Sequence, residues 1–321
     1  MKTLKKLFKS IKSKPIFSSI AGVFLLLTAS CTNKVQTKTV ALNNEPLNIE
    51  KSIPQNNPLP PEFNDYWYTG EAEISSYTLE QARYGELRKG QAVLIYVTED
   101  FLPEIQVKAD NRHKNNISVL KLNATKTFNT GIYPYSIMQS TFYPVTNNKH
   151  ALKVSSSMQE WCGHTYVQLN NREQYEVTLH SYFEGEADKK LVIDKSILEN
   201  ELWTQLRLNP KSLPIGDLKI IPALEFIRLK HVPIKAYPAK AVLKNDMYHI
   251  TYPSLNRTLT ITFNPEFPYD ILGWEESYKS GFGSNSKVLT TRASKLKSIK
   301  TPYWNKNRNS DEVLRETLML N

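Results

Sequence analysis

The chain has 321 residues but only two cysteines, Cys31 and Cys162. A network of disulfides therefore cannot hold the fold, which must depend on a hydrophobic core that a chain of this length can provide. Free cysteines are usually buried in the manner of small hydrophobic side chains. We therefore expect Cys162 to be buried.

Long apolar runs are also missing. The main run near the start, Ile16 to Leu27, is shorter than the roughly 20 residues that a transmembrane helix needs. It follows a segment with six lysines and no acidic residue. This order of a basic segment and a short apolar segment is typical of a secretory leader.

The four residues Thr28-Ala29-Ser30-Cys31 resemble the lipobox of bacterial lipoproteins, although that pattern prefers Leu where this chain has Thr28. The resemblance implies that residues 1–30 are a signal peptide. It also implies that the Cys31 thiol carries a diacylglyceryl group and that its new amine receives a fatty acyl group such as palmitate. Two or three acyl chains are enough for stable attachment to a membrane lipid layer.

Residues 32–34 are Thr, Asn and Lys, so the Asp that resembles an inner-membrane retention signal is missing after Cys31. We therefore predict a lipid-anchored protein of the cell envelope, located at the outer membrane. Without residues 1–30 the chain has 35 basic and 31 acidic side chains, a net charge of +4. This small excess does not favour nucleic acid as a partner.

Residues 31–62 contain the predicted lipidated cysteine and then a segment rich in Asn, Gln and Pro with few large apolar side chains. Such a composition cannot bury enough apolar surface to offset the entropy lost on ordering. We expect a flexible tether that reaches on the order of 30 Å. Residues 63–321 are predicted to form a single, mainly β globular domain.

Alternating apolar residues predict many strands. Val93, Ile95 and Val97 would occupy one face of a strand with Leu94 and Tyr96 opposite, which indicates burial on both faces. The expected strands are Glu71–Tyr77, Gln91–Thr98, Ser118–Thr127, Ile132–Val145, Leu152–Leu169, Gln174–Phe183, Glu225–His231, Ile234–Leu243, Met247–Tyr252, Arg257–Phe263 and Tyr269–Tyr278.

Two helices are expected among these strands. Ser196 and Glu199 have the spacing of a capping box, an apolar stripe follows, and Pro210 ends the helix after Leu208. A short C-terminal helix is expected over Asp311 to Leu320, with Ser310 as its cap.

The fold class is therefore mainly β, either a sandwich, a barrel or a curved sheet. We favour a curved antiparallel sheet or half-barrel, because the mid-chain helix lies between two groups of strands and could fill the concave side. This architecture resembles the half-barrels of the lipoprotein-carrier (Lol) family, with which the sequence shares no motif.

Four strings look like an uncharacterised family of bacterial envelope lipoproteins, whose members sometimes carry the label septum formation inhibitor Maf. They are Tyr66–Tyr77, Asn129–Ser136, Gln159–His164 and Trp274–Tyr278. True Maf proteins are cytoplasmic nucleotide pyrophosphatases of α/β fold with a Ser-x-Ser-Pro-Arg-Arg motif near the start. This chain lacks that motif, so we do not expect Maf chemistry.

Glu160, Cys162 and His164 form the pattern that most resembles a catalytic site. On a strand their spacing of two would place all three on one face, where a carboxylate could orient the imidazole that activates the thiol. The arrangement would suit a Cys-His hydrolase or acyltransferase acting on envelope acyl or peptide bonds. The alternative, which we favour, is a buried structural trio.

The sequence gives no sign of a metal or cofactor. The six histidines include no pair at metal-ligand spacing, and Gly281-Phe282-Gly283-Ser284 lacks the lysine of a phosphate-binding loop. We expect neither group to be bound.

Aromatic residues are abundant, with 5 Trp, 17 Tyr and 12 Phe. Trp67, Tyr133, Tyr135 and Trp274 belong to clusters that could line a groove for sugar rings or acyl chains, although strands favour aromatic residues regardless of function. We predict an envelope lipoprotein that binds a lipid, glycan or protein partner without catalysis.

Overall fold

The computed structural model describes residues 59–146 and 150–320. The chain divides into two units, Met1–Glu50 and Lys51–Asn321, and everything below concerns the second unit. The predicted signal peptide, Cys31 and the predicted tether up to residue 58 lie outside the described residues. None of the helices in the described ranges combines the length and the apolar character needed to cross a bilayer.

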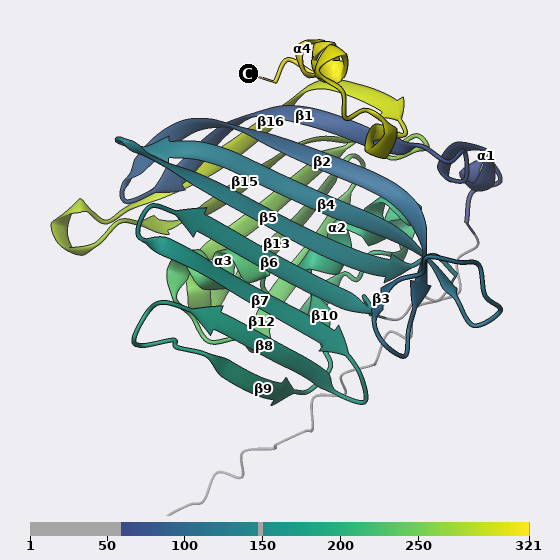
Figure 1. Ribbon diagram of the computed structural model, residues 1–321. Helices are drawn as coiled ribbons and strands as arrows, with labels where there is room; N and C mark the ends of the chain where they lie inside the picture. Colours follow the sequence, from purple (N-terminus) through teal and green to yellow (C-terminus); the bar gives the residue numbers. More distant parts are fainter. Residues whose placement is uncertain (1–58, 147–149, 321) are drawn as a thin grey trace, which may run out of the picture. The chain divides into compact units, whose positions relative to one another are not determined.

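One sheet dominates the described part of the chain (Figure 1). Its strand order is β10-β11-β12-β13-β14-β15-β16-β1-β2-β4-β5-β6-β7-β8-β9, with the short β3 paired to β2. The strands are β1 (Ala72–Arg83), β2 (Glu86–Leu102), β3 (Val107–Lys108), β4 (Ile117–Thr130), β5 (Tyr133–Pro144), β6 (Lys153–Glu160), β7 (Gly163–Asn171), β8 (Tyr175–Ser181), β9 (Lys189–Ile193), β10 (Ile197–Leu198), β11 (Gly216–Ile221), β12 (Tyr237–Lys244), β13 (Met247–Tyr252), β14 (Arg257–Phe263), β15 (Ile271–Ser280) and β16 (Lys287–Thr301).

The sheet curves, and its two halves face each other with helices α2 (Glu199–Leu208) and α3 (Leu224–Lys230) between them (Figure 1). Nearly all neighbouring strands are antiparallel, and β1 pairs with β16 although the two are far apart in the chain. The predicted curved antiparallel sheet around a mid-chain helix is therefore confirmed. The sheet is open, because β9 at one edge and β10 at the other are joined only by the chain at 194–196.

The two-sided burial expected for residues 91–98 is present in β2. Leu94 and Tyr96 belong to the main core on the concave side. Val97, together with Val93 and Ile95, instead packs on the outer face against Leu318 from the C-terminal segment. That segment contains α4 (Val313–Thr317), so the C-terminus covers the outside of the central strands.

The mid-chain helix α2 is confirmed, but its cap differs from the prediction. The Ser196 hydroxyl donates to the backbone carbonyl of Lys219 instead of capping the helix. Glu201 supplies the cap, because its carboxylate accepts a hydrogen bond from the Leu198 backbone N–H at 3.1 Å. At the C-terminus, Ser310 lies in a 3-10 turn before α4 and does not cap it.

The segment 225–231 is a helix, which makes the strand predicted there wrong. Its Leu224 and Ile227 side chains are buried one turn apart, and His231 ends the helix in the left-handed conformation. These seven residues carry three apolar side chains, and so short a segment suits a helix or a strand equally well, so periodicity could not separate the two. A further short helix, α1 (Phe63–Trp67), and the strands β9, β11 and β16 were not expected.

Two buried ion pairs hold α2 at its two ends. Near its start, both oxygens of Glu199 accept hydrogen bonds from Arg257 on β14. In its last turn, Arg207 donates to Glu73 on β1 through Nη1 and Nη2, at 2.6 and 2.7 Å. An acid at the N-terminus and a base at the C-terminus also suit the helix dipole.

We expect Arg207→Leu to lower the free energy of unfolding by about 3–5 kcal/mol, because it leaves the buried Glu73 carboxylate without its charged partner. Arg292→Leu is the matched control, since Arg292 pairs with Glu275 where both side chains are at least half exposed. That change should alter stability by only about 0–1 kcal/mol. Denaturant unfolding measures both, and equal losses would contradict the assignment.

The Glu73 pair should also make stability depend on pH. Burial acts to raise the pKa of Glu73, but the charge and hydrogen bonds of Arg207 outweigh it and lower the pKa from 4.5 to about 2. The stability advantage of the native chain over Glu73→Gln should therefore be complete above about pH 4.5. It should shrink by about 3 kcal/mol as the pH falls towards 2, measured by denaturant unfolding across that range. An advantage that does not change with pH would disprove this linkage.

Candidate functional site

A groove of about 460 Å³ lies between the β7–β9 edge of the sheet, helix α3 and the segment 231–234. Its volume falls within the usual range of small-ligand sites. Most of its lining is apolar and comes from Val167, Leu179, Leu191, Val192, Ile193, Leu224, Ile227, Val232, Pro233 and Ile234. A long apolar group could therefore lie in it without meeting unpaired polar atoms.

The groove exists because the sheet does not close. Strand β9 is an edge strand that pairs only with β8, and the opposite edge strand β10 has two residues. The edges are joined at Ser196, whose carbonyl accepts a hydrogen bond from the Tyr175 hydroxyl at 2.8 Å. Away from this junction, α3 and the chain that follows it form the opposite wall of the groove.

One part of the groove is polar. Glu186 Oε1 accepts hydrogen bonds from Arg228 Nη1 at 2.9 Å and contacts His231 Nδ1 at 2.7 Å. Arg228 Nε donates to the Thr165 hydroxyl at 3.2 Å, and its guanidinium lies 4.1 Å from the ring centre of Phe183. Arg228 is largely buried, and this burial lowers the pKa of its guanidinium.

The charges at this polar part favour an anion. Arg228 and Lys189 line the groove with Glu186 as the single acidic side chain in the lining, and since Glu186 is paired with Arg228, the lining carries one excess positive charge. The groove thus combines an apolar channel with a region of positive charge. This combination suits an amphiphile with an anionic head group.

A second, smaller cavity of about 50 Å³ lies beside the start of α2. Glu199, Glu225 and Glu276 line it together with Arg257 and Lys126. Burial raises the pKa of Glu225, against the opposing effect of the Lys126 ammonium 2.8 Å away. The cavity has room for a few water molecules and none for an organic ligand, so we interpret it as a structural polar centre.

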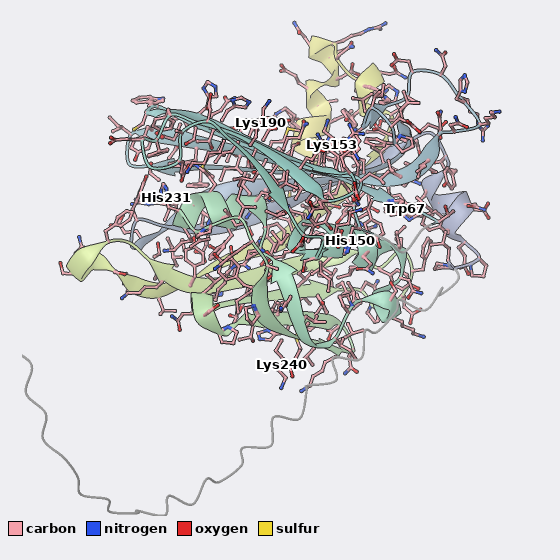
Figure 2. All side chains as sticks on the ribbon, turned by 90° about the horizontal axis from the view of Figure 1, so that it is seen from below. Trp67, His150, Lys153, Lys190, His231 and Lys240 are labelled. Atoms are coloured by element: carbon pink, nitrogen blue, oxygen red, sulfur yellow. The ribbon has the colours of Figure 1, made fainter. Side chains whose placement is uncertain are left out.

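The four aromatic residues predicted to line one groove are in three different places. Trp67 is the buried last residue of α1, and its ring centre lies 5.0 Å from the Arg207 guanidinium. Trp274 lines the small polar cavity, while Tyr133 and Tyr135 lie 6.0 Å apart near the hairpin turns. The structure therefore does not bring these four side chains together to line one groove, and Figure 2 places Trp67 far from His231 of the groove described above.

Cys162 is exposed, so the expectation that it is buried is wrong. The predicted strand 152–169 is in fact the hairpin of β6 and β7, and Cys162 lies in the two-residue turn between them. Because the turn interrupts the alternation, Glu160 follows the buried face of β6 while His164 follows the exposed face of β7. The predicted Glu160, Cys162 and His164 trio therefore does not share one face.

The surroundings of Cys162 do not activate it. Glu160 accepts a hydrogen bond from the Cys162 backbone N–H at 2.8 Å and another from the Tyr182 hydroxyl at 2.5 Å. Its hydrogen bond to the thiol, aided by its charge, raises the pKa of Cys162, whereas a cysteine nucleophile needs a lowered pKa. Among the described contacts no hydrogen bond links His164 to the thiol.

Sequence reasoning missed Arg228, Glu186 and His231. The available signal was Arg228 itself, a charged residue between the apolar Ile227 and Leu229. Groups of three or more His, Cys, Asp or Glu side chains that could hold a metal ion are not found in the described residues. The candidate site is therefore the groove of 17 lining residues and not a metal or thiol centre.

We expect Cys162 to react slowly with iodoacetamide at pH 8, because Glu160 disfavours the thiolate. Glu160→Gln should speed the reaction several-fold, while Glu184→Gln, an exposed glutamate outside this cluster, should not. His164→Ala should leave the rate unchanged. Mass spectrometry of the Cys162 peptide gives the rates, and a rate that falls in His164→Ala would support the Cys-His pair instead.

No protein family matches the chain, and no curated protein matches it. Among solved structures, a β-barrel-like protein of the domain of unknown function DUF1849 from Brucella abortus is similar, with 8% identity and a TM-score of 0.41 over 72% of this chain and 97% of that one. A porin-like protein from Bacteroides uniformis has 10% identity and a TM-score of 0.22 over 74% of this chain and 98% of that one. At these values neither similarity bears on function.

Proposed function

We propose that this protein is a lipid-anchored protein of the cell envelope that binds an amphiphilic lipid in the groove between β7–β9 and α3, without catalysis. The observation that carries the proposal is a preformed groove of about 460 Å³ with mainly apolar walls and a positively charged region. The anchor would be the acylated Cys31, as the lipobox-like residues imply. The location would be the outer membrane, as residues 32–34 imply.

The lining favours a lipid over the glycan or protein partner that the sequence left open. Burial of each methylene group in such a channel contributes about 0.8 kcal/mol. Sugar hydroxyls would instead need hydrogen-bond partners, and the apolar walls between Leu179 and Ile227 offer few. The acyl chain would lie along these walls, and the anionic head group would lie near Arg228 and Lys189.

Membership of the uncharacterised envelope lipoprotein family remains part of this proposal. Its support is the set of four sequence strings together with a fold that is mainly β. Nucleotide pyrophosphatase activity of the Maf type is not proposed, because the chain lacks the Ser-x-Ser-Pro-Arg-Arg motif and the described part is not an α/β fold.

We expect the native chain to bind the fluorescent fatty acid cis-parinaric acid saturably in a fluorescence titration. Leu179→Trp should weaken binding at least about tenfold by filling the channel, since each 1.4 kcal/mol lost is tenfold in Kd. Leu272→Trp is the control, because Leu272 is exposed on β15 away from the groove. Both variants are checked for an unchanged unfolding midpoint.

The charged region is tested separately with Arg228→Gln. This change should weaken binding of the fatty acid more than binding of the corresponding fatty alcohol, because only the acid carries a negative charge. Saturable binding that is equal in the native chain, Leu179→Trp and Leu272→Trp would show that the groove is not the site.

A further inference from the structure

Several hairpin turns lie together at the end of the sheet away from α1 (Figure 1). They join β1 to β2, β4 to β5, β6 to β7, β8 to β9 and β15 to β16. Large apolar side chains are exposed at three of these turns, with Ile132 84% exposed and both Trp161 and Phe282 69% exposed. Tyr182 is also exposed at the start of the β8–β9 turn.

The exposed rings of Phe282 and Trp161 are linked through Tyr84, Tyr135 and Tyr133, of which Tyr135 is buried. The ring centres of Phe282 and Tyr84 lie 6.2 Å apart, and the Tyr84 hydroxyl is 2.8 Å from that of Tyr135. Tyr135 and Tyr133 are 6.0 Å apart, and Tyr133 and Trp161 are 6.4 Å apart. Single exposed apolar residues are normal on a protein surface, whereas Ile132, Trp161 and Phe282 gather at the turns of one end of the sheet, as side chains of an interaction site do.

A basic recess lies directly beside Phe282. It has a volume of about 480 Å³ and contains Lys230 and Lys279. Its other lining residues are neutral, namely Leu255, Asn256, Gly281, Phe282, Gly283 and Ser286. The Lys230 ammonium donates to the Lys279 backbone carbonyl at 2.6 Å, so the charged end of Lys230 lies next to the backbone from which the Lys279 side chain starts.

The two lysines have no acidic side chain in the recess to balance them. Burial and the nearby positive charges of Arg83 and Lys279 lower the pKa of Lys230. An anionic group in the recess would relieve this repulsion. A phosphate group would satisfy both the charge and the hydrogen-bonding capacity of the ammonium groups.

We propose that this end of the sheet is a docking surface for a lipid bilayer that contains anionic phospholipid. Ile132, Trp161 and Phe282 would enter the interfacial region, where aromatic side chains are favoured, and Lys230 and Lys279 would hold a phospholipid head group. The pairing of an apolar rim with an adjacent basic recess argues for a membrane surface over a protein partner.

The length of the chain allows the docking surface to reach the same bilayer as the predicted anchor. Strand β2 has 17 residues and spans about 55 Å, which sets the scale of the sheet. The 27 residues between Cys31 and Leu59 can extend over at most about 90 Å. Docking would also bring the polar part of the groove to the membrane surface, because His231 lies at this end (Figure 2) and Arg228 is 3.0 Å from it.

The test uses the mature chain from residue 31 with Cys31→Ser, so that attached acyl chains cannot bind the vesicles. Flotation is measured with vesicles of phosphatidylcholine alone and with vesicles of equal parts phosphatidylcholine and phosphatidylglycerol. We expect binding to the mixed vesicles that weakens with added salt. Trp161→Asp with Phe282→Asp should reduce it at least about tenfold, as each aromatic anchor is lost.

The lysines are tested by the double variant Lys230→Gln with Lys279→Gln. Its affinity for the mixed vesicles should fall about fivefold per lysine, and its affinity for vesicles of phosphatidylcholine should not change. Leu272→Asp and the pair Lys240→Gln with Lys244→Gln are matched controls on exposed positions elsewhere in the sheet, and both should bind as the parent does. The double variant Trp161→Phe with Phe282→Trp keeps an aromatic side chain at both positions and should still bind the vesicles. It therefore separates loss of the aromatic anchors from loss of the fold.

Three results would overturn the proposal. They are no binding to either vesicle, binding that the turn variants leave unchanged, and binding of inorganic phosphate to the recess without any flotation. The groove variant Leu179→Trp should float as the parent does, so failure of the docking surface is distinguishable from failure of the lipid groove.

Discussion

The two buried ion pairs of α2 determine how the rest of the unit is arranged. Arg207 is paired with β1 and Glu199 with β14, and β15 and β16 separate these two strands in the sheet. A buried charge that loses its partner is strongly unfavourable, so the helix cannot slide or turn without breaking one pair. The curved sheet is thus fixed at two points around α2, and the groove remains where the edges do not meet.

Local sequence patterns predicted those strands and helices whose secondary structure depends mainly on their own residues. The two-sided alternation around Leu94 was correct, and its cause is the C-terminal segment that packs on the outer face. The helix at 199–208 followed from its apolar stripe. Segment 225–231 was misjudged because seven residues fit both periods, and Cys162 was misplaced because a two-residue turn broke the assumed alternation.

The candidate site could not be predicted in the same way. Its walls come from β7, β8 and β9 on one side and from α3 on the other, and they meet only because the sheet curves and stays open. Glu186 and Arg228 are 42 residues apart, and nothing in their local sequence indicates that they pair. The aromatic residues were easier to notice, but most of them stabilise the core or the turns.

The pairing of β1 with β16 has a consequence for how the chain acquires its structure. Ala72 lies opposite Thr301, so the middle of the sheet joins the first and the last strand of the described residues. A chain emerges from a ribosome or a translocation pore with its N-terminus first. Strand β1 therefore lacks its neighbour β16 until nearly the whole chain has emerged. Contacts so distant in sequence form slowly, and the exposed strand edge attracts other chains meanwhile. The edge of β1 that faces β16 therefore stays open during that interval, while the other edge of β1 can already pair with β2.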